Sequence, residues 1–103
     1  MMKKTVYEER YSNGQLKLHI NYKNGKEDGL SELYYPDGQL KFRVNYKNGK
    51  LDGPSEWWYE NGQLMIRTNF KNGKRDGLFE EWYEDSRLLA WCIYEDGIKF
   101  NLD

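Results

Sequence analysis

Residues 35–58 read YPDGQLKFRVNYKNGKLDGPSEWW, and the chain contains this 24-residue unit three times. The preceding copy runs from Tyr11 as YSNGQLKLHINYKNGKEDGLSELY, and the following copy runs from Tyr59 as YENGQLMIRTNFKNGKRDGLFEEW. A period of this length is typical of repeat proteins, in which each unit packs on its neighbours and equivalent side chains form rows. Such an architecture favours a protein that binds a partner over one that catalyses a reaction.

The composition predicts a thin structure in one domain. The chain has 103 residues, no linker-like stretch and a hydrophobic share of 38%. That share is unusually aromatic, with 4 Trp, 9 Tyr and 4 Phe. Large flat rings cover a sheet effectively when there is too little aliphatic mass for a deep core. We therefore expect residues 1–103 to form one repeat domain with a single curved layer.

Charge and cysteine content exclude several classes of protein. The 16 Lys and Arg nearly balance the 17 Asp and Glu, and the net charge of −1 argues against strong attraction to nucleic acid. The single cysteine, Cys92, excludes an intrachain disulfide. No apolar run follows Lys3 and Lys4, and no apolar stretch is long enough to span a bilayer. We expect a cytoplasmic protein without a signal peptide.

Two kinds of turn signal divide each unit into strands. One is Asn-Gly or Asp-Gly before Gln, as at Asp37-Gly38, and the other is Lys-Asn-Gly-Lys, as at Asn48-Gly49. Both dipeptides suit the positive φ angles of a two-residue type I′ hairpin. Apolar and polar residues alternate from Leu40 to Tyr46, which indicates a strand with two different faces. The pattern predicts an all-β fold, a single-layer curved antiparallel β-meander of about eight strands.

The same pattern predicts the unit boundaries and the strand register. A partial N-terminal strand covers residues 5–11, and a degenerate C-terminal repeat covers residues 83–103 after the repeats 11–34, 35–58 and 59–82. The expected cross-strand pairs are Leu33–Phe42, Glu32–Arg43 and Tyr35–Leu40 in one hairpin, and Val44–Gly53 and Phe42–Ser55 in the next. This register turns Glu27, Leu51 and Arg75 inward, so we expect a bulge near the Asp-Gly pairs to correct it.

The phrase YxNGQLK…NYKNGKxDG resembles the MORN-variant repeat of bacterial proteins catalogued as YwqK-like antitoxins of toxin–antitoxin systems. The resemblance covers about residues 11 to 97 and implies a curved β-meander built from MORN-like hairpins. It departs from the pattern after the Gly-Leu step, where Ser31 and Ser55 stand in place of an aromatic residue and only Phe79 conforms. The matching residues in one copy are Tyr35, Gly38, Gln39, Leu40, Lys41, Tyr46, Asn48, Gly49, Lys50, Asp52 and Gly53.

No constellation of catalytic or metal-binding residues is apparent. The lone His19 falls on the outward face opposite Glu8 and is interpreted as a surface ion-pair residue, because a catalytic base needs positioned partners. Cys92 falls on the inward face and is interpreted as a small core residue. The recurring Asp28, Asp52 and Asp76 are interpreted as turn caps or partners of nearby asparagines, since lysines beside them disfavour a cation site. We expect no cofactor, no metal and no enzymatic activity.

Lysines flank the second turn of every unit and line one edge of the predicted sheet. Their ordinary role is to keep the edge soluble and prevent association of sheets, and nearby acids weaken any attraction to phosphate. Nucleic-acid binding is disfavoured, and contact with a membrane surface is the weaker alternative to protein binding. The six lysines are Lys23, Lys26, Lys47, Lys50, Lys71 and Lys74.

The outward face changes character along the chain. Positions held by lysine, arginine or histidine, and asparagine in the early copies become Leu89, Trp91 and Ile93 in the last copy. Either the tail Ile98-Lys99-Phe100-Asn101-Leu102 or a second copy covers these residues, or they dock a partner. A cap should become more polar outside, which favours docking. The residues expected to bind the partner are Tyr34, Trp58, Met65, Trp82, Leu89, Trp91 and Ile93, with Arg43, Arg67, Glu56 and Glu80 around them.

Two functions remain in competition. The first is an antitoxin or immunity protein that occludes a cognate toxin or effector, with homo-oligomerisation as a further possibility. The second is a MORN-type scaffold or membrane-apposed module that uses the lysine edge. An enzyme is disfavoured because no nucleophile or acid–base pair can be assembled.

Overall fold

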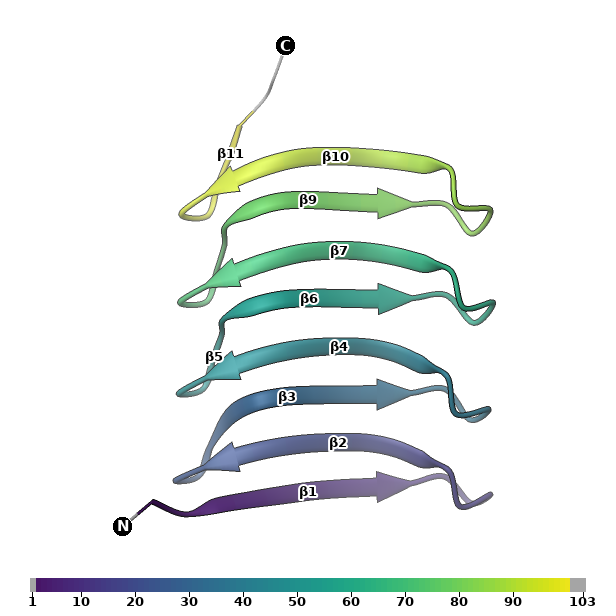
Figure 1. Ribbon diagram of the computed structural model, residues 1–103, viewed down its shortest axis with the longest axis vertical. Helices are drawn as coiled ribbons and strands as arrows, with labels where there is room; N and C mark the ends of the chain where they lie inside the picture. The colour runs from purple at the N-terminus through teal and green to yellow at the C-terminus, as the bar shows by residue number, and fades with distance from the viewer. Residues whose placement is uncertain (1, 101–103) are drawn as a thin grey trace.

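Residues 2–100 form one antiparallel sheet with no second layer (Figure 1). The structure, a computed structural model, describes residues 2–100. Its principal extents are 48 × 36 × 10 Å. Because two packed sheets are already about 10 Å apart between their backbones, a molecule 10 Å thick has room for a single layer. The single-layer all-β prediction is therefore confirmed.

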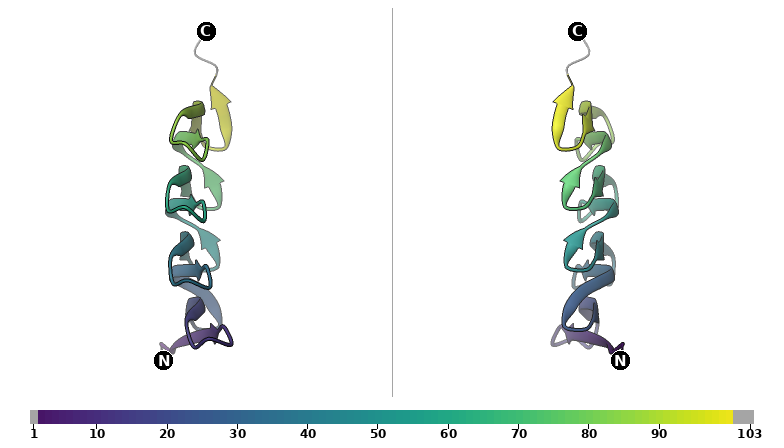
Figure 2. Two further views of the ribbon diagram at one scale, coloured as in Figure 1. Left: turned by 90° about the vertical axis from the view of Figure 1, so that its right-hand side faces the viewer. Right: turned by 90° about the vertical axis from the view of Figure 1, so that its left-hand side faces the viewer.

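The strands bow across the sheet and stack in a straight column (Figures 1 and 2). Their order is β1-β2-β3-β4-β6-β7-β9-β10-β11, with β5 paired to β4 and β8 paired to β7. The strands are β1 Lys4–Arg10, β2 Leu16–Lys23, β3 Lys26–Tyr34, β4 Leu40–Lys47, β5 Lys50–Leu51, β6 Gly53–Trp58, β7 Leu64–Lys71, β8 Lys74–Arg75, β9 Gly77–Trp82, β10 Leu88–Glu95 and β11 Ile98–Phe100.

The described part of the chain contains eleven strands where about eight were expected. The eight long strands are the expected ones, and the additional ones are the short β5, β8 and β11. Gly53 and Gly77 adopt φ angles of 108° and 97°, a region that L side chains rarely enter, and the chain bends there. These bends separate β5 from β6 and β8 from β9.

The two turn signals produce different turns. Asn48 and Gly49 both have positive φ, 50° and 82°, which confirms a type I′ loop. At the other turn only Gly38 has positive φ, and its N–H donates to the carbonyl oxygen of Tyr35 at 2.9 Å. The predicted type I′ loop there is wrong: Tyr35 pairs with Gln39 across three residues, the pattern of a type I turn ending in a glycine bulge.

The register is partly as predicted. Leu33 opposes Phe42 and Glu32 opposes Arg43, as expected. A bulge then pairs Tyr34 with Leu40, so the expected pairing of Tyr35 with Leu40 is wrong. In the next hairpin Phe42 opposes Trp57, not Ser55, and the expected Val44–Gly53 pairing is wrong as well. Each shift is the geometric cost of the bulge or bend beside it.

The bulge near the Asp-Gly pairs is present, but it does not turn the suspect side chains outward. Tyr22 opposes Glu27 and Ile20 opposes Ser31, so Asn21 faces three residues. The two extra residues leave the in–out parity unchanged. Glu27, Leu51 and Arg75 therefore remain on the same face as the aromatic row that they oppose, and the expected correction is wrong. That row contains Tyr22, Tyr46 and Phe70.

The best-buried residues form a row across the middle of the inner face. Val44 is 5% exposed, and the small residues Ser31, Ser55 and Thr68 lie beside it in register. Larger side chains cover this row, including Phe42 and Trp57, whose ring centroids are 6.2 Å apart. The serines that replace aromatic residues thus occupy the most crowded positions of the sheet. The hydroxyls of Ser31, Ser55 and Thr68 have no protein hydrogen-bond partner.

Tyrosine and aspartate side chains join each unit to the next. The Tyr35 hydroxyl donates to the carbonyl oxygen of Trp58 at 2.7 Å, and Tyr59 donates to Trp82 in the same way. Asp28 accepts a hydrogen bond at 3.1 Å from the backbone N–H of Asn48, in the next type I′ turn. The prediction of turn capping is confirmed, although the capped turn belongs to the following unit. Asp52 and Asp76 repeat this contact with the N–H groups of Asn72 and Asp96.

Candidate protein-binding face

Charged and aromatic side chains share the outer face of the central units. The Arg43 guanidinium donates to Glu56 at 2.8 Å and lies 5.6 Å from the centroid of the Trp58 ring. One unit further, Arg67 contacts Glu80 at 2.9 Å and lies 5.6 Å from Trp82. Each arginine thus closes an ion pair and a cation–π contact at once. These six predicted residues lie together on one face.

Tyr34 lies on this face beside the first of these clusters. It is half-buried, and burial raises the pKa of its hydroxyl, with the negative charge of Glu32 adding to the effect. Arg43 acts in the opposite direction. Tyr34 is therefore neutral at physiological pH and lies near the charges of Glu32 and Arg43. Met65, also predicted for this surface, is half-buried on β7.

The outer face becomes apolar on β9 and β10. Trp91 is 52% exposed where earlier units carry the paired arginines, and it lies opposite Glu80. Trp82 is only half-buried beneath Arg67. Leu88 on β10 is also exposed (51%) but holds the position of the inward-facing Leu40 and Leu64. We call the four exposed apolar residues that share the outer face of these two strands the C-terminal patch: Leu78 (46% exposed), Leu89 (43%), Trp91 (52%) and Ile93 (37%).

Leu78 belongs to this patch, although comparison of the sequence copies does not predict it. It lies directly opposite Ile93. Leu30 and Pro54 hold the equivalent positions in the earlier units. Each of them faces an asparagine, so these positions form no apolar cluster there. The pairing of β9 with β10 would have revealed Leu78, because Glu80 opposes Trp91 and parity then brings Leu78 to Ile93.

The described part of the tail does not cover the patch. Ile98–Phe100 forms β11, which extends the sheet beside the end of β10 and pairs Phe100 with Ile93. Ile98 and Phe100 are themselves exposed, at 67% and 45%. The hypothesis of a covering tail is wrong for these residues, and Asn101 and Leu102 lie outside the described residues.

The other predicted positions contribute contacts of a structural kind. His19 Nδ1 lies 2.7 Å from Glu8 Oε2, as expected from the register. Cys92 is half-buried opposite Phe79, less buried than the predicted core position. Within residues 2–100, no group of three or more His, Cys, Asp or Glu side chains is placed to hold a metal ion. The same residues contain no helix of the length and apolarity that a bilayer crossing requires.

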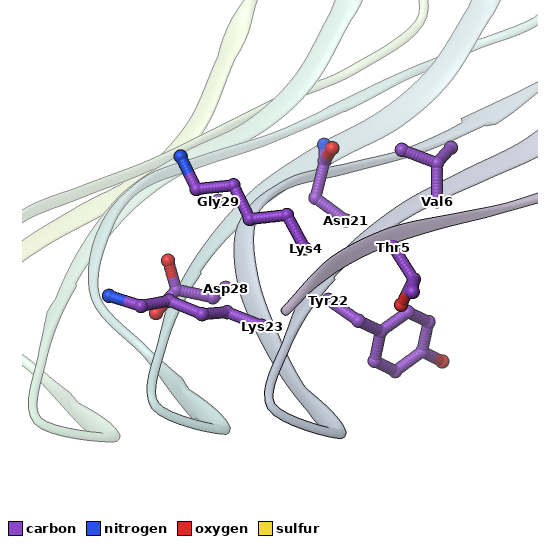
Figure 3. A pocket seen from close by; sticks show the side chains of 8 residues that line it. All are labelled: Lys4, Thr5, Val6, Asn21, Tyr22, Lys23, Asp28 and Gly29. Carbon is purple, nitrogen blue, oxygen red and sulfur yellow. The ribbon is translucent and has the colours of Figure 1, made fainter. Parts of the chain in front are cut away.

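Recesses on the surface are shallow and open to solvent. One of about 410 Å³ lies beside β1, where Lys4, Lys23 and Asp28 line it together with Asn21 and Tyr22 (Figure 3). Asp28 already caps the Asn48 turn. No nucleophile beside a base lines this recess, so it provides no assembly for general acid–base or nucleophilic chemistry.

The fold and its exposed face define a single-layer β-repeat protein, in which the face of the sheet is the main surface for contact. The sequence matches the MORN repeat variant at residues 5–24, 27–48 and 51–72, more than half of the chain, and the protein belongs to this family. No curated protein matches the chain. The C-terminal patch follows the last matched segment.

Proposed function

We propose that the protein is a non-enzymatic binding module that docks a protein partner on the outer face of β9 and β10. The observation that carries the proposal is the C-terminal patch, in which Leu78, Leu89, Trp91 and Ile93 are each more than one-third exposed. Contiguous apolar surface with a tryptophan is typical of interface centres. Full burial of each such side chain contributes about 1.5–3 kcal/mol to the free energy of association.

Charged residues beside the patch provide the selectivity. Glu80 lies opposite Trp91 and is already held by Arg67, so the ion pair is ordered before a partner arrives. Ordered charges around an apolar centre act mainly on the choice and orientation of partners. The central clusters of Arg43 with Glu56 and Trp58 extend this rim toward the N-terminal units.

The finer proposal concerns the identity of the partner. The resemblance of the repeat to YwqK-like proteins favours a toxin or effector that the module neutralises by covering its active surface. No catalytic group is needed for such inhibition, because occlusion requires only affinity. Co-expression with the product of a neighbouring gene tests this proposal. Rescue of growth by the wild type and not by a Leu78→Ser variant is expected, and a toxicity unaffected by the wild type would refute the toxin assignment.

The lysine edge is a less favoured binding surface. The aliphatic stem of Lys26 packs near Gly49: a Cβ atom placed on Gly49 would lie 3.8 Å from the Lys26 Cβ. Lys50 packs near Gly73 in the same way. Asp28 and Asp52 stand among these lysines and cap the neighbouring turns. The carboxylates reduce the local positive potential that an anionic surface requires.

A matched pair of variants tests the docking face. Leu78→Ser removes a patch residue, and Leu30→Ser changes the equivalent position two units earlier, which is 39% exposed but faces Asn45. Partner capture by the immobilised protein should fall with Leu78→Ser and Trp91→Ala and persist with Leu30→Ser, while far-UV circular dichroism stays unchanged. Equal loss from both serine variants would contradict the assignment, and unfolding of Trp91→Ala would show that the patch is core.

A further inference from the structure

Within residues 2–100, strand β10 has an unpaired edge over most of its length. It pairs with β9 from Leu88 to Tyr94, but β11 reaches only Ile93, Tyr94 and Glu95. In the preceding units the equivalent strands β4 and β7 pair on that side with β6 and β9. Among residues 2–100, no strand pairs with 88–92 on the side away from β9. The free N–H and C=O groups of such an edge are a template for another strand.

Strand β1 has the complementary free edge at the other end of the column. Its residues, Lys4–Arg10, occupy the place in the repeat that β6 and β9 occupy in later units, 48 and 72 residues onward. Within the described residues β1 pairs only with β2. In the described sheet, β10 therefore has no following strand along residues 88–92, and β1 at the other end is a strand of the kind that follows.

We propose that β1 of a second copy of the chain adds to the free edge of β10, which joins the two sheets head to tail. The register comes from the repeat: because Arg67 opposes Glu80, the residue facing Trp91 one unit later is Glu8 of the second copy. Cys92 then faces Tyr7, and Ala90 faces Glu9. This inference concerns the edge of β10 and does not depend on the partner proposed for its outer face.

The junction pairs the same two residue types as a contact inside the chain, arginine and tryptophan, but each stands on the strand where the other stands inside the chain. Inside the chain an arginine on one strand stacks on a tryptophan of the next, as Arg43 does on Trp58 at 5.6 Å. At the junction these two positions are held by Trp91 and Arg10. Arg10 is exposed and gives one N–H to the Gly14 carbonyl oxygen at 3.1 Å, so four of its five donors remain for other contacts. The cation–π contact is conserved across the junction.

The tyrosine ladder points to the same junction. Tyr11, Tyr35 and Tyr59 each donate their hydroxyl to a backbone carbonyl 23 residues later. Tyr83 is the next member of this series, is 43% exposed, and has no such carbonyl partner within residues 2–100. In the head-to-tail register, the carbonyl oxygen of Arg10 in the second copy takes this place.

The geometry of the column decides the form of the assembly. The units rise in a straight stack without bending toward closure (Figure 2). A heterologous contact that does not close a ring adds further copies in a line. We therefore expect an open, concentration-dependent series of oligomers.

Sedimentation velocity of the full chain over a concentration series tests the proposal. The wild type should form the open series. Arg10→Ala and Trp91→Ala should each weaken association about fivefold or more, since one cation–π contact is lost. The double variant Arg10→Trp with Trp91→Arg recreates the interior pair and should restore association. Lys41→Ala, exposed in the middle of the sheet, is the control and should change nothing. A wild type that stays monomeric, or a double variant no better than the singles, overturns the proposal.

A disulfide test fixes the register independently. Tyr7→Cys places a thiol opposite Cys92 of the neighbouring copy, at the short Cα separation of paired strands that a disulfide accepts. Oxidation by copper–phenanthroline should give a ladder of covalent oligomers on a non-reducing gel, whereas Val6→Cys, on the other face, should not. A tail-to-tail contact would join Cys92 to Cys92 and stop at dimers, which overturns the head-to-tail arrangement. Leu78→Ser separates the two proposals, because it should reduce partner capture and leave the oligomer series intact.

Discussion

The Arg67 guanidinium lies 5.6 Å from the centroid of the Trp82 ring, the same separation that Arg43 keeps from Trp58 one unit earlier. The repetition of this contact shows that the outer face is organised as well as the inner one. Arg67 also forms an ion pair with Glu80 on the facing strand, at 2.9 Å. This single-layer sheet thus gains part of its stability from charged and aromatic side chains on its outer face.

Arg67→Ala should lower the free energy of unfolding by about 1 kcal/mol, because it removes an exposed ion pair and a cation–π contact together. Urea denaturation followed by tryptophan fluorescence measures this change. Lys71→Ala, at the end of the same strand and exposed, is the control, since Lys71 takes part in no ion pair among the described residues. Equal effects of the two variants would show that the Arg67 cluster contributes nothing specific.

Tyr59→Phe should cost about 1 kcal/mol of stability, the usual net contribution of one hydrogen bond. The lost bond is the one from the Tyr59 hydroxyl to the Trp82 carbonyl oxygen, 2.7 Å long. Tyr83→Phe is the matched control at the equivalent position, because its hydroxyl has no carbonyl partner of this kind in residues 2–100. Thermal unfolding at low protein concentration, where monomers dominate, compares the two. A Tyr83→Phe variant as destabilised as Tyr59→Phe would argue against the ladder.

Thr68→Val should raise the free energy of unfolding by about 1 kcal/mol. Thr68 is 3% exposed and its hydroxyl has no protein hydrogen-bond partner, so the isosteric valine removes a buried polar group without changing the packed volume. Urea denaturation measures the gain. A loss of stability would mean that the hydroxyl has a partner, such as a bound water molecule, whose contact outweighs its burial.

Stability should fall when the pH rises above about 10, the ordinary tyrosine pKa. Burial raises the pKa of Tyr46, with the charge of Glu27 adding to the effect. Above the ordinary value the unfolded chain therefore loses this proton more readily than the folded chain, and linkage makes stability decrease with pH. Urea denaturation at about pH 9 and about pH 11 should show a smaller decrease for Tyr46→Phe than for the wild type. An equal decrease in both would remove Tyr46 from the explanation.

Much of the fold was predictable because its signals are local. The type I′ turn at Asn48-Gly49 needs two residues that tolerate positive φ, and the dipeptide provides them. The alternation from Leu40 to Tyr46 then separates the two faces, and Glu32 meets Arg43 as expected. The turn at Asp37-Gly38 carries a nearly identical dipeptide, yet only its glycine has positive φ. The dipeptide therefore does not select the turn type. Contact between units does not select it either, because Gly14, with no atom within 4 Å of its Cβ position, forms the same turn as Gly38.

The sequence predicts where the candidate surface lies, but not every residue that belongs to it. Comparison of the copies selected Leu89, Trp91 and Ile93, because these positions break rows that are polar elsewhere. Leu78 was missed, since its own row is apolar or proline throughout. Whether these residues bind a partner stays a prediction that the variants above test.

Neighbouring residues are enough to predict the strands, their order and their two faces, because the period of 24 and the alternation of two are local properties of the chain. The bulges that set the register, and the apolar side chains that remain exposed, depend instead on how the strands pack across the sheet. Trp82 is half-buried because Arg67 lies over it from the adjacent strand, whereas Trp91 is exposed because no described strand follows β10 on that side. Exposure in a single sheet depends on the neighbouring strand, and that neighbour is assigned by the fold.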